Sequence, residues 1–203
     1  MNLPNKLTLT RLILVPFMVV SFYLTPLASG IVPYITTLIF IVAAFTDFLD
    51  GNIARKRGIV TDFGKFMDPL ADKALVLVAL ILILDGQIIP IPYIASISLS
   101  IMLVRELVVS GLRLVGANKG VVIAADKLGK IKTITQDIAI PALLITQAFS
   151  PVLFDNAATS TINPIYSIIM IFGVVMLVIA SIVSVISGVS YVLKNIELFK
   201  EAK

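Results

Sequence analysis

Long apolar stretches, separated by short polar segments, follow one another along almost the whole chain. A helix that crosses the apolar core of a bilayer, about 30 Å thick, needs roughly 20 predominantly apolar residues. Pro and Gly residues mark most of the breaks between the stretches, and the third and fourth reach full length only with their charged ends. The pattern predicts an all-α integral membrane protein, a bundle of about six transmembrane helices over residues 12–28, 31–48, 70–84, 91–104, 134–149 and 165–193.

The composition of the chain is that of a membrane protein rather than of a soluble domain. Of its 203 residues, 59% are hydrophobic and 14% are charged, whereas soluble domains average about 45–50% and about 25%. A soluble domain of this size could not bury so much apolar surface. We therefore expect a single membrane domain over residues 1–203, in which residues 1–11 form an interfacial N-terminal segment that starts as a short helix lying in the membrane interface.

The positive charges of the chain fall on one side of the predicted bundle. The three alternate loops contain no Lys or Arg. All 16 Lys and Arg residues lie in four segments, at 6–11, 55–73, 105–132 and 194–203. Because cytoplasmic loops of membrane proteins are enriched in Lys and Arg, we expect this side of the bundle and both termini to face the cytoplasm. The expected location is the cell membrane. The basic residues are not interleaved with aromatic ones, so membrane lipids are the expected partners and nucleic acid is not.

Two absences limit the chemistry that the chain can perform. The sequence contains no Cys and no His, which excludes disulfides, thiolate nucleophiles and metals bound by Cys or His. Catalysis would have to use carboxylates, hydroxyls, Lys or Arg. A bound metal would be a hard cation with oxygen ligands, such as Mg²⁺, Mn²⁺ or Ca²⁺.

Aspartates gather near the polar ends of the second and third predicted helices. Asp47 and Asp50 are spaced i, i+3, and Asp68 and Asp72 are spaced i, i+4, so each pair shares one helix face. Asp62 is expected in the connecting loop, outside the site. Four converging carboxylates would repel one another, and two divalent cations with oxygen ligands remove that repulsion. Ordinary interfacial carboxylates paired with nearby Lys and Arg residues are the alternative.

Small residues accompany these carboxylates. Gly51, Ala54 and Gly58 lie along the second helix, and Gly64 precedes the second aspartate pair. Small side chains leave room for a bulky ligand, although they also allow helices to pack closely. Arg55 has a guanidinium that can donate two hydrogen bonds to a phosphate. Carboxylates, metals, free space and an arginine together indicate a site for a diphosphate.

The spacing of these residues resembles the signature of the CDP-alcohol phosphotransferase family. All eight fixed positions match, in the run Asp47-x-x-Asp50-Gly51-x-x-Ala54-Arg55, eight further residues, then Gly64-x-x-x-Asp68-x-x-x-Asp72. The resemblance implies six helices around a cytoplasm-facing polar cavity that is accessible to lipid. It also implies an enzyme with two divalent cations, Mg²⁺ or Mn²⁺, as cofactors.

Three further segments resemble the branch of that family that contains the phosphatidylglycerophosphate synthases. They are Asn5-x-x-Thr8-x-x-Arg11, Arg105-Glu106-x-x-x-x-Gly111-Leu112-Arg113 and Gly129-Lys130-x-Lys132-Thr133. The likeness implies transfer of the phosphatidyl group from CDP-diacylglycerol to sn-glycerol 3-phosphate, which gives phosphatidylglycerophosphate and CMP in anionic phospholipid biosynthesis. Sister enzymes that use inositol phosphate, phosphatidylglycerol or serine are the alternative.

The resemblance also assigns roles to individual residues. Asp47, Asp50 and Asp68 would bind the metals, with Asp68 bridging them, and Asp72 would complete the second metal site. Asp72 would also take the proton of the acceptor hydroxyl, which a metal makes more acidic. The residues implied at the nucleotide and its diphosphate are Asn5, Thr8, Gly51, Ala54, Arg55, Thr61 and Gly64.

A phosphorylated acceptor needs cations, and the segment around the fourth and fifth predicted helices supplies six of them near Glu106 and Asp126. Topology and contacts with lipid head groups are the alternative use of these basic residues. Lys119 and Lys127 are assigned to topology alone. The residues predicted at the acceptor phosphate are Arg105, Arg113, Lys130 and, as an alternate, Lys132.

Other classes of protein stay open as alternatives. A cation transporter could use the carboxylates as an ion path, but transporters place charge near the bilayer midplane or on both sides, whereas here it gathers on one side. A structural membrane protein would need no such cluster. Asn5 and Thr8 could instead cap the first helix. Ser184 and Gly188 are spaced for close helix packing, within one chain or in a homodimer.

Overall fold

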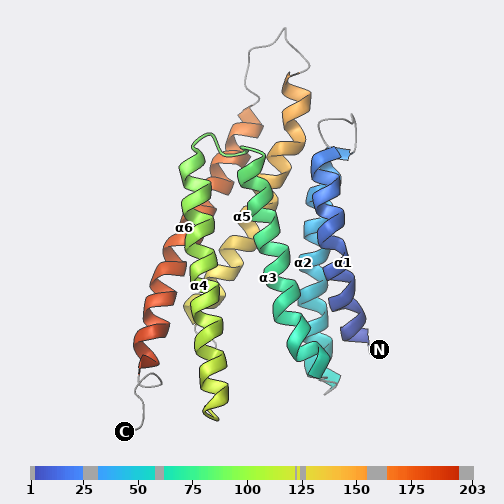
Figure 1. Ribbon diagram of the computed structural model, residues 1–203. Helices are drawn as coiled ribbons and strands as arrows, with labels where there is room; N and C mark the ends of the chain where they lie inside the picture. The colour runs from blue at the N-terminus through green and yellow to red at the C-terminus, as the bar shows by residue number, and fades with distance from the viewer. Residues whose placement is uncertain are drawn as a thin grey trace.

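The computed structural model describes residues 3–24, 32–57, 62–121, 123, 127–154 and 164–196. Within these ranges, the backbone alone is described at 3–4, 32–33, 47–57, 62–66, 92 and 147–154. The described parts form six α-helices (Figure 1), namely α1 (Leu3–Leu24), α2 (Val32–Arg57), α3 (Asp62–Asp85), α4 (Pro92–Asn118), α5 (Lys127–Phe154) and α6 (Pro164–Lys194).

Successive helices run in opposite directions (Figure 1). Their contacts close a ring in the order α1, α2, α5, α6, α4, α3, and α3 also touches α2 and α5. The start of α1 and the end of α6 therefore point to the same end of the bundle (Figure 1). We call it the basic end, because it carries the described residues Lys6, Arg11, Lys73, Arg105, Arg113, Lys119, Lys127, Lys130, Lys132 and Lys194.

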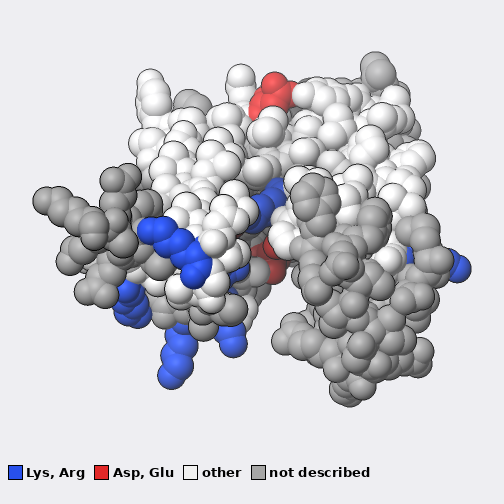
Figure 2. Space-filling view, turned by 60° about the horizontal axis from the view of Figure 1, so that its bottom comes forward, with Lys and Arg blue, Asp and Glu red and all other residues white. Residues whose placement is uncertain are grey.

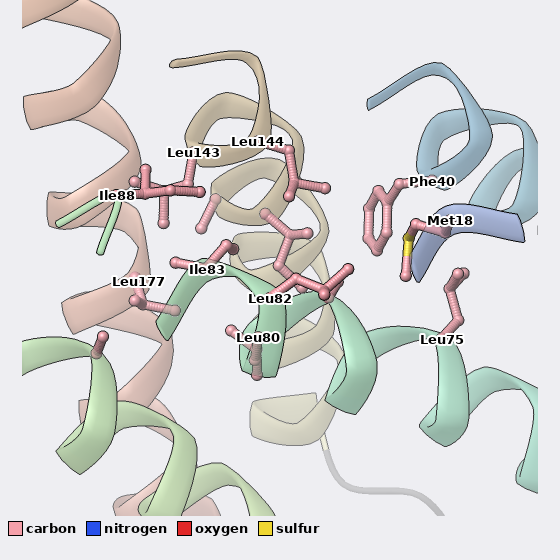
Figure 3. Close-up of a cluster of buried hydrophobic side chains, with 14 of the residues drawn as sticks. Met18, Phe40, Leu75, Leu80, Leu82, Ile83, Ile88, Leu143, Leu144 and Leu177 are labelled. Atoms are coloured by element: carbon pink, nitrogen blue, oxygen red, sulfur yellow. The ribbon is translucent and has the colours of Figure 1, made fainter. Parts of the chain in front are cut away.

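A cluster of buried apolar side chains joins the helices beyond the basic end (Figure 3). Met18, Phe40 and Leu75 meet where α1, α2 and α3 come together, and Leu143 and Leu177 lie on the facing parts of α5 and α6. These five side chains are at most 2% exposed. In lipid, close packing rather than loss of water contact holds helices together, so this cluster joins the described helices beyond the basic end.

The outward faces of the helices are also apolar. On α6, the side chains of Ile165, Ile168 and Ile171 are between 57% and 66% exposed, and soluble proteins rarely expose continuous patches of this kind. Among the described residues, three helical segments are long and apolar enough to cross a membrane, by length and composition: Asn5–Leu24, Tyr93–Asn118 and Pro164–Lys194. The all-helical architecture is as expected, and these faces are suited to contact with lipid.

Several helices extend beyond their apolar stretches at the basic end. The apolar pattern marks residues 91–104 and 134–149, whereas α4 continues to Asn118 and α5 already begins at Lys127. The placement of Asp62 in a loop is wrong, because α3 begins at this residue. Backbone hydrogen bonds continue a helix into polar surroundings, where apolar periodicity no longer marks it, and the helix dipole favours an acidic residue at the N-terminus.

The N-terminal segment belongs to α1, which runs without a break from Leu3 to Leu24. Asn5, Thr8 and Arg11 of this segment are buried, and their spacing of three residues places them on one side of the helix. Since α1 packs against α2 and α3, this side brings polar groups into the bundle.

The two small residues of α6 pack within the chain. Ser184 is fully buried, and a Cβ atom added at Gly188 would lie 3.3 Å from Cγ of Arg105 on α4. The pair therefore serves the contact between α4 and α6, and a homodimer stays a prediction.

We predict that Gly173→Val loosens the contact between α5 and α6. A Cβ atom at Gly173 would lie 2.8 Å from Cγ of Leu143, so the larger side chain must push the helices apart. Overpacking of this kind costs about 1–3 kcal/mol, which should lower the midpoint of thermal unfolding in detergent.

The matched control is Val175→Ile, which adds a methyl group on the same helix at a side chain that is 49% exposed. Its unfolding midpoint should stay at the wild-type value. An unchanged midpoint for Gly173→Val would contradict close packing at this position.

Candidate functional site

A cavity of about 1020 Å³ opens at the basic end between α3, α4, α5 and α6. Figure 2 views the bundle from this end and shows a hollow in the middle of the face, with both basic and acidic surface inside it. The polar and charged residues that line the cavity are Asp68, Asp72, Lys73, Arg105, Glu106, Ser110, Arg113, Lys130, Lys132, Thr133, Gln136 and Tyr191.

One wall of the cavity carries the two described aspartates of the predicted metal site. Asp68 and Asp72 are one turn apart on α3, and both side chains are partly buried. Thr8 of α1, which is 1% exposed, donates a hydrogen bond from Oγ1 to Oδ1 of Asp68 over 2.5 Å. The structure thus joins a residue predicted at the nucleotide with a residue predicted at the metals.

The cavity also carries a cluster of three cations around one carboxylate, which α3, α4 and α5 contribute together. Glu106 of α4 accepts hydrogen bonds from Nη1 of Arg105 at 2.8 Å and from Nζ of Lys132 at 3.0 Å. Nζ of Lys73 on α3 lies 3.8 Å from Oε2 of Glu106. We call these four residues the Glu106 cluster. Three positive charges around one negative charge leave a net positive charge, which suits a phosphate.

Helix α6 fixes the two arginines of the site. Arg105 donates from Nη2 to Oγ of Ser187 at 3.0 Å, and Arg113 donates from Nε to the hydroxyl of Tyr191 at 3.0 Å. The guanidinium of Arg113 also lies 5.8 Å from the centre of the Tyr191 ring, within the range of a cation–π interaction. Ser187 and Tyr191 are one turn apart, so a single polar stripe of α6 holds both arginines.

A glycine allows Arg105 to reach this position. A Cβ atom added at Gly129 would lie 2.8 Å from Nη2 of Arg105, closer than such atoms approach one another. The guanidinium therefore passes over the first turn of α5 because residue 129 has no side chain. Lys73 donates to Oγ of Ser110, and Ser110 donates to the backbone oxygen of Glu106 at 2.6 Å, which ties α3 to the same turn of α4.

The residues of the predicted metal site fit a hard cation as far as they are described. Asp68 and Asp72 supply carboxylate oxygens at one cavity wall, the donor type that Mg²⁺ and Mn²⁺ prefer. Asp47 and Asp50 lie on α2, which contacts α3, but their side chains are outside the described residues. The described side chains by themselves do not form a group of three or more His, Cys, Asp or Glu residues that could bind a metal.

The cavity brings together most of the predicted site residues that the structure describes. The two aspartates, Arg105, Arg113, Lys130 and Lys132 all line it, and Asn5 is buried on α1. Lys130 is exposed, whereas Lys132, the alternate, is buried within the Glu106 cluster. Thr61 lies outside the described residues, as do the side chains of Asp47, Asp50, Gly51, Ala54, Arg55 and Gly64.

Sequence reasoning missed several residues of the cavity. Glu106 stands in a segment that resembles the family branch, but the sequence pattern assigns no site role to it or to Lys73, Gln136 and Tyr191. Lys73 follows a predicted metal ligand, and Gln136 lies one turn after Lys132, so helical spacing could have suggested both. Nothing in the sequence around Tyr191 indicates that it faces an arginine of another helix.

The sequence of the chain is similar to those of several known proteins. The relatives include proteins of Bacillus subtilis and Haemophilus influenzae, which are 44% and 46% identical to the chain over 155 and 145 residues, 71% and 70% of the chain and 77% and 75% of the relatives. A relative from Rickettsia felis is 33% identical over 190 residues, 94% of the chain and 93% of the relative. All three are named CDP-diacylglycerol–glycerol-3-phosphate 3-phosphatidyltransferase.

The comparison with protein families covers nearly the whole chain. The model of the CDP-alcohol phosphatidyltransferase family matches residues 1–193, which include all six helices almost to the end of α6. This match confirms the resemblance that the aspartate motif indicated. The chain belongs to the CDP-alcohol phosphatidyltransferase family.

Proposed function

We propose that the protein transfers the phosphatidyl group from CDP-diacylglycerol to sn-glycerol 3-phosphate, giving phosphatidylglycerophosphate and CMP. The observation that carries this proposal is the cavity, which is lined both by two aspartates and by a cluster of net positive charge. The relative from Rickettsia felis, which aligns with 94% of the chain at 33% identity, carries the name of this activity. A phosphorylated acceptor fits the Glu106 cluster, whereas serine would need groups of another kind.

The basic residues and the aspartates of the cavity have different tasks in the reaction. Arg105, Arg113, Lys130 and Lys132 bind the acceptor phosphate and direct its hydroxyl toward α3. Asp72 takes the proton of that hydroxyl. The hydroxyl oxygen then forms a bond to the phosphorus that carries the diacylglycerol, while the bond from this phosphorus to the CMP oxygen breaks and CMP leaves. Holding both substrates in one cavity makes the attack effectively unimolecular.

Two divalent cations, Mg²⁺ or Mn²⁺, are the cofactors that we assign to Asp47, Asp50, Asp68 and Asp72. When bound, they supply positive charge to the diphosphate and acidify a nearby hydroxyl. The remaining contacts with the nucleotide and its diphosphate are assigned to Asn5, Thr8, Gly51, Ala54, Arg55, Thr61 and Gly64. The hydrogen bond from Thr8 to Asp68 and the burial of Asn5 support this assignment.

The proposed orientation in the membrane rests on the distribution of Lys and Arg between the two ends of the bundle. We assign residues 1–203 to a single multi-pass domain of the cell membrane, with six transmembrane helices and with the basic end and both termini in the cytoplasm. Lys and Arg gather at the basic end (Figure 2), and cytoplasmic ends of membrane helices are enriched in these residues. A cytoplasm-facing cavity would meet a water-soluble acceptor directly, while the acyl chains of the donor stay in the bilayer.

The test of this function is a panel of acceptors. Purified protein in detergent receives CDP-diacylglycerol with glycerol 3-phosphate, inositol phosphate or serine, and CMP release is measured. We expect CMP with glycerol 3-phosphate only, with the reaction stopped by EDTA and restored by Mg²⁺ or Mn²⁺. CMP with another acceptor alone would assign a sister activity, and ion flux in vesicles without CMP release would favour a transporter.

We predict that Asp72→Asn reduces kcat by about 10²–10⁴-fold, the usual contribution of a general base, because the chain has no His to replace it. The thermal unfolding midpoint should change little. The control is Asp85→Asn, at the far end of α3, where the carboxylate accepts a hydrogen bond from Tyr23. Near-normal turnover of Asp72→Asn would refute its role as the base.

We predict that Arg113→Ala raises KM for glycerol 3-phosphate roughly tenfold or more, the effect of losing one charged hydrogen bond. KM for CDP-diacylglycerol should change much less. Tyr191→Phe, which removes the hydroxyl that accepts from Arg113, should have a smaller effect in the same direction. Lys119→Ala is the control for lost positive charge, since Lys119 does not line the cavity. Equal changes in both KM values would indicate a structural role for Arg113.

A further inference from the structure

Gln136 is a buried polar residue of the cavity that none of the roles above uses. It lies on α5 one turn beyond Lys132, on the same side of the helix, and its side chain is 1% exposed. Its carbonyl oxygen Oε1 has no hydrogen-bond partner among the described residues. Buried polar groups nearly always have a partner, and a molecule that enters the cavity can supply one.

The surroundings of Gln136 narrow the kind of partner. Helices α3 and α5 begin at the basic end and α4 ends there (Figure 1), so Val76 and Leu77 lie beyond Lys73, Met102 beyond Arg105 and Gln136 beyond Lys132 along their helices. The side chains of Val76, Leu77 and Met102, which line this part of the cavity, are apolar and donate no hydrogen bond. The cations of the cluster already suit a phosphate one turn nearer to the mouth. A ligand whose phosphate lies at the cluster would therefore bring its carbon chain within reach of Gln136.

The chemistry of the amide selects a hydroxyl at that end. A carbonyl oxygen accepts hydrogen bonds and needs a donor, and a fully ionised phosphate has no proton to donate. Glycerol 3-phosphate carries two hydroxyls, of which one reacts and gives its proton to Asp72. The other hydroxyl has no partner in the mechanism above. One turn of helix, about 6 Å for four residues, is a span that a three-carbon phosphate can bridge.

We propose that Oε1 of Gln136 accepts a hydrogen bond from the hydroxyl of the acceptor that does not react. The proposal rests on the proposed function and adds a residue that determines specificity. A site built to bind a hydroxyl discriminates against an analogue that lacks it, because the buried partner is then left without a hydrogen bond. Gln136 would thus select glycerol 3-phosphate over phosphorylated alcohols with a single hydroxyl.

The experiment compares glycerol 3-phosphate with its two deoxy analogues, 3-hydroxypropyl phosphate and 2-hydroxypropyl phosphate. Each analogue lacks one hydroxyl, and the analogue that retains the reacting hydroxyl is the one that yields CMP. The readout is the ratio of kcat/KM for glycerol 3-phosphate to kcat/KM for that analogue. For the wild type we expect a ratio of roughly ten, the effect of one neutral hydrogen bond.

Gln136→Met keeps the length of the side chain but removes the acceptor oxygen, and its ratio should fall close to one. Gln136→Glu keeps a carbonyl-type acceptor, and its ratio should stay near the wild-type value even if its charge weakens binding of both compounds. Thr133→Val is the matched control, because Thr133 lines the same cavity while its hydroxyl donates to the backbone oxygen of Gly129 at 3.1 Å. Its ratio should not change.

The outcomes separate the two proposals. If the wild type uses glycerol 3-phosphate and Gln136→Met keeps the wild-type ratio, the role of Gln136 is overturned and the proposed function stands. A lost ratio in Gln136→Glu would overturn it as well, and this variant decides the matter if Gln136→Met does not fold. If the wild type releases no CMP with glycerol 3-phosphate, the proposed function fails, and the role of Gln136 fails with it.

Discussion

The carboxylate of Glu106 holds cationic side chains from three helices beside one cavity, and the geometry of the site depends on it. Lys132 is 5% exposed at its side chain and Glu106 is 19% exposed, so neither charge is well solvated by water. A buried charge without a partner is costly, and three cations without a carboxylate would repel one another. Glu106 lets α3, α4 and α5 present positive charge to the same space and still leaves a surplus for a phosphate.

Helix α6 shows how an apolar element can support a polar site. Its outward face is suited to lipid, with Ile168 and Ile171 exposed, and its inward face carries Ser187 and Tyr191, which hold Arg105 and Arg113. The guanidinium groups are thus fixed by hydrogen bonds before any ligand arrives. Such preorganisation matters for catalysis, since donors that are already in place need no reorganisation during the reaction.

The cavity separates two tasks that the proposed reaction requires. In that reaction Asp68 and Asp72 of α3 would supply carboxylates for metals and for a proton, and the Glu106 cluster would supply positive charge for the acceptor. The apolar cluster beyond the cavity (Figure 3) packs the described helices together on the far side, which favours approach of the proposed substrates from the basic end or from the lipid beside it. This direction of approach agrees with the gathering of basic residues at the same end (Figure 2), whereas a transporter would be expected to place charge near the bilayer midplane or on both sides.

The sequence by itself determined the elements that depend on local pattern. Apolar stretches predicted six helices, the placement of Lys and Arg predicted one basic end, and the spacing of eight residues from Asp47 to Asp72 indicated the family. Only the tertiary structure decided which side chains meet across helices. Lys132 rather than Lys130 joins Glu106, 26 residues away, and Arg105 joins Ser187, 82 residues away. Spacing along a chain fixes neighbours on the same helix, whereas contacts between helices depend on how the helices pack.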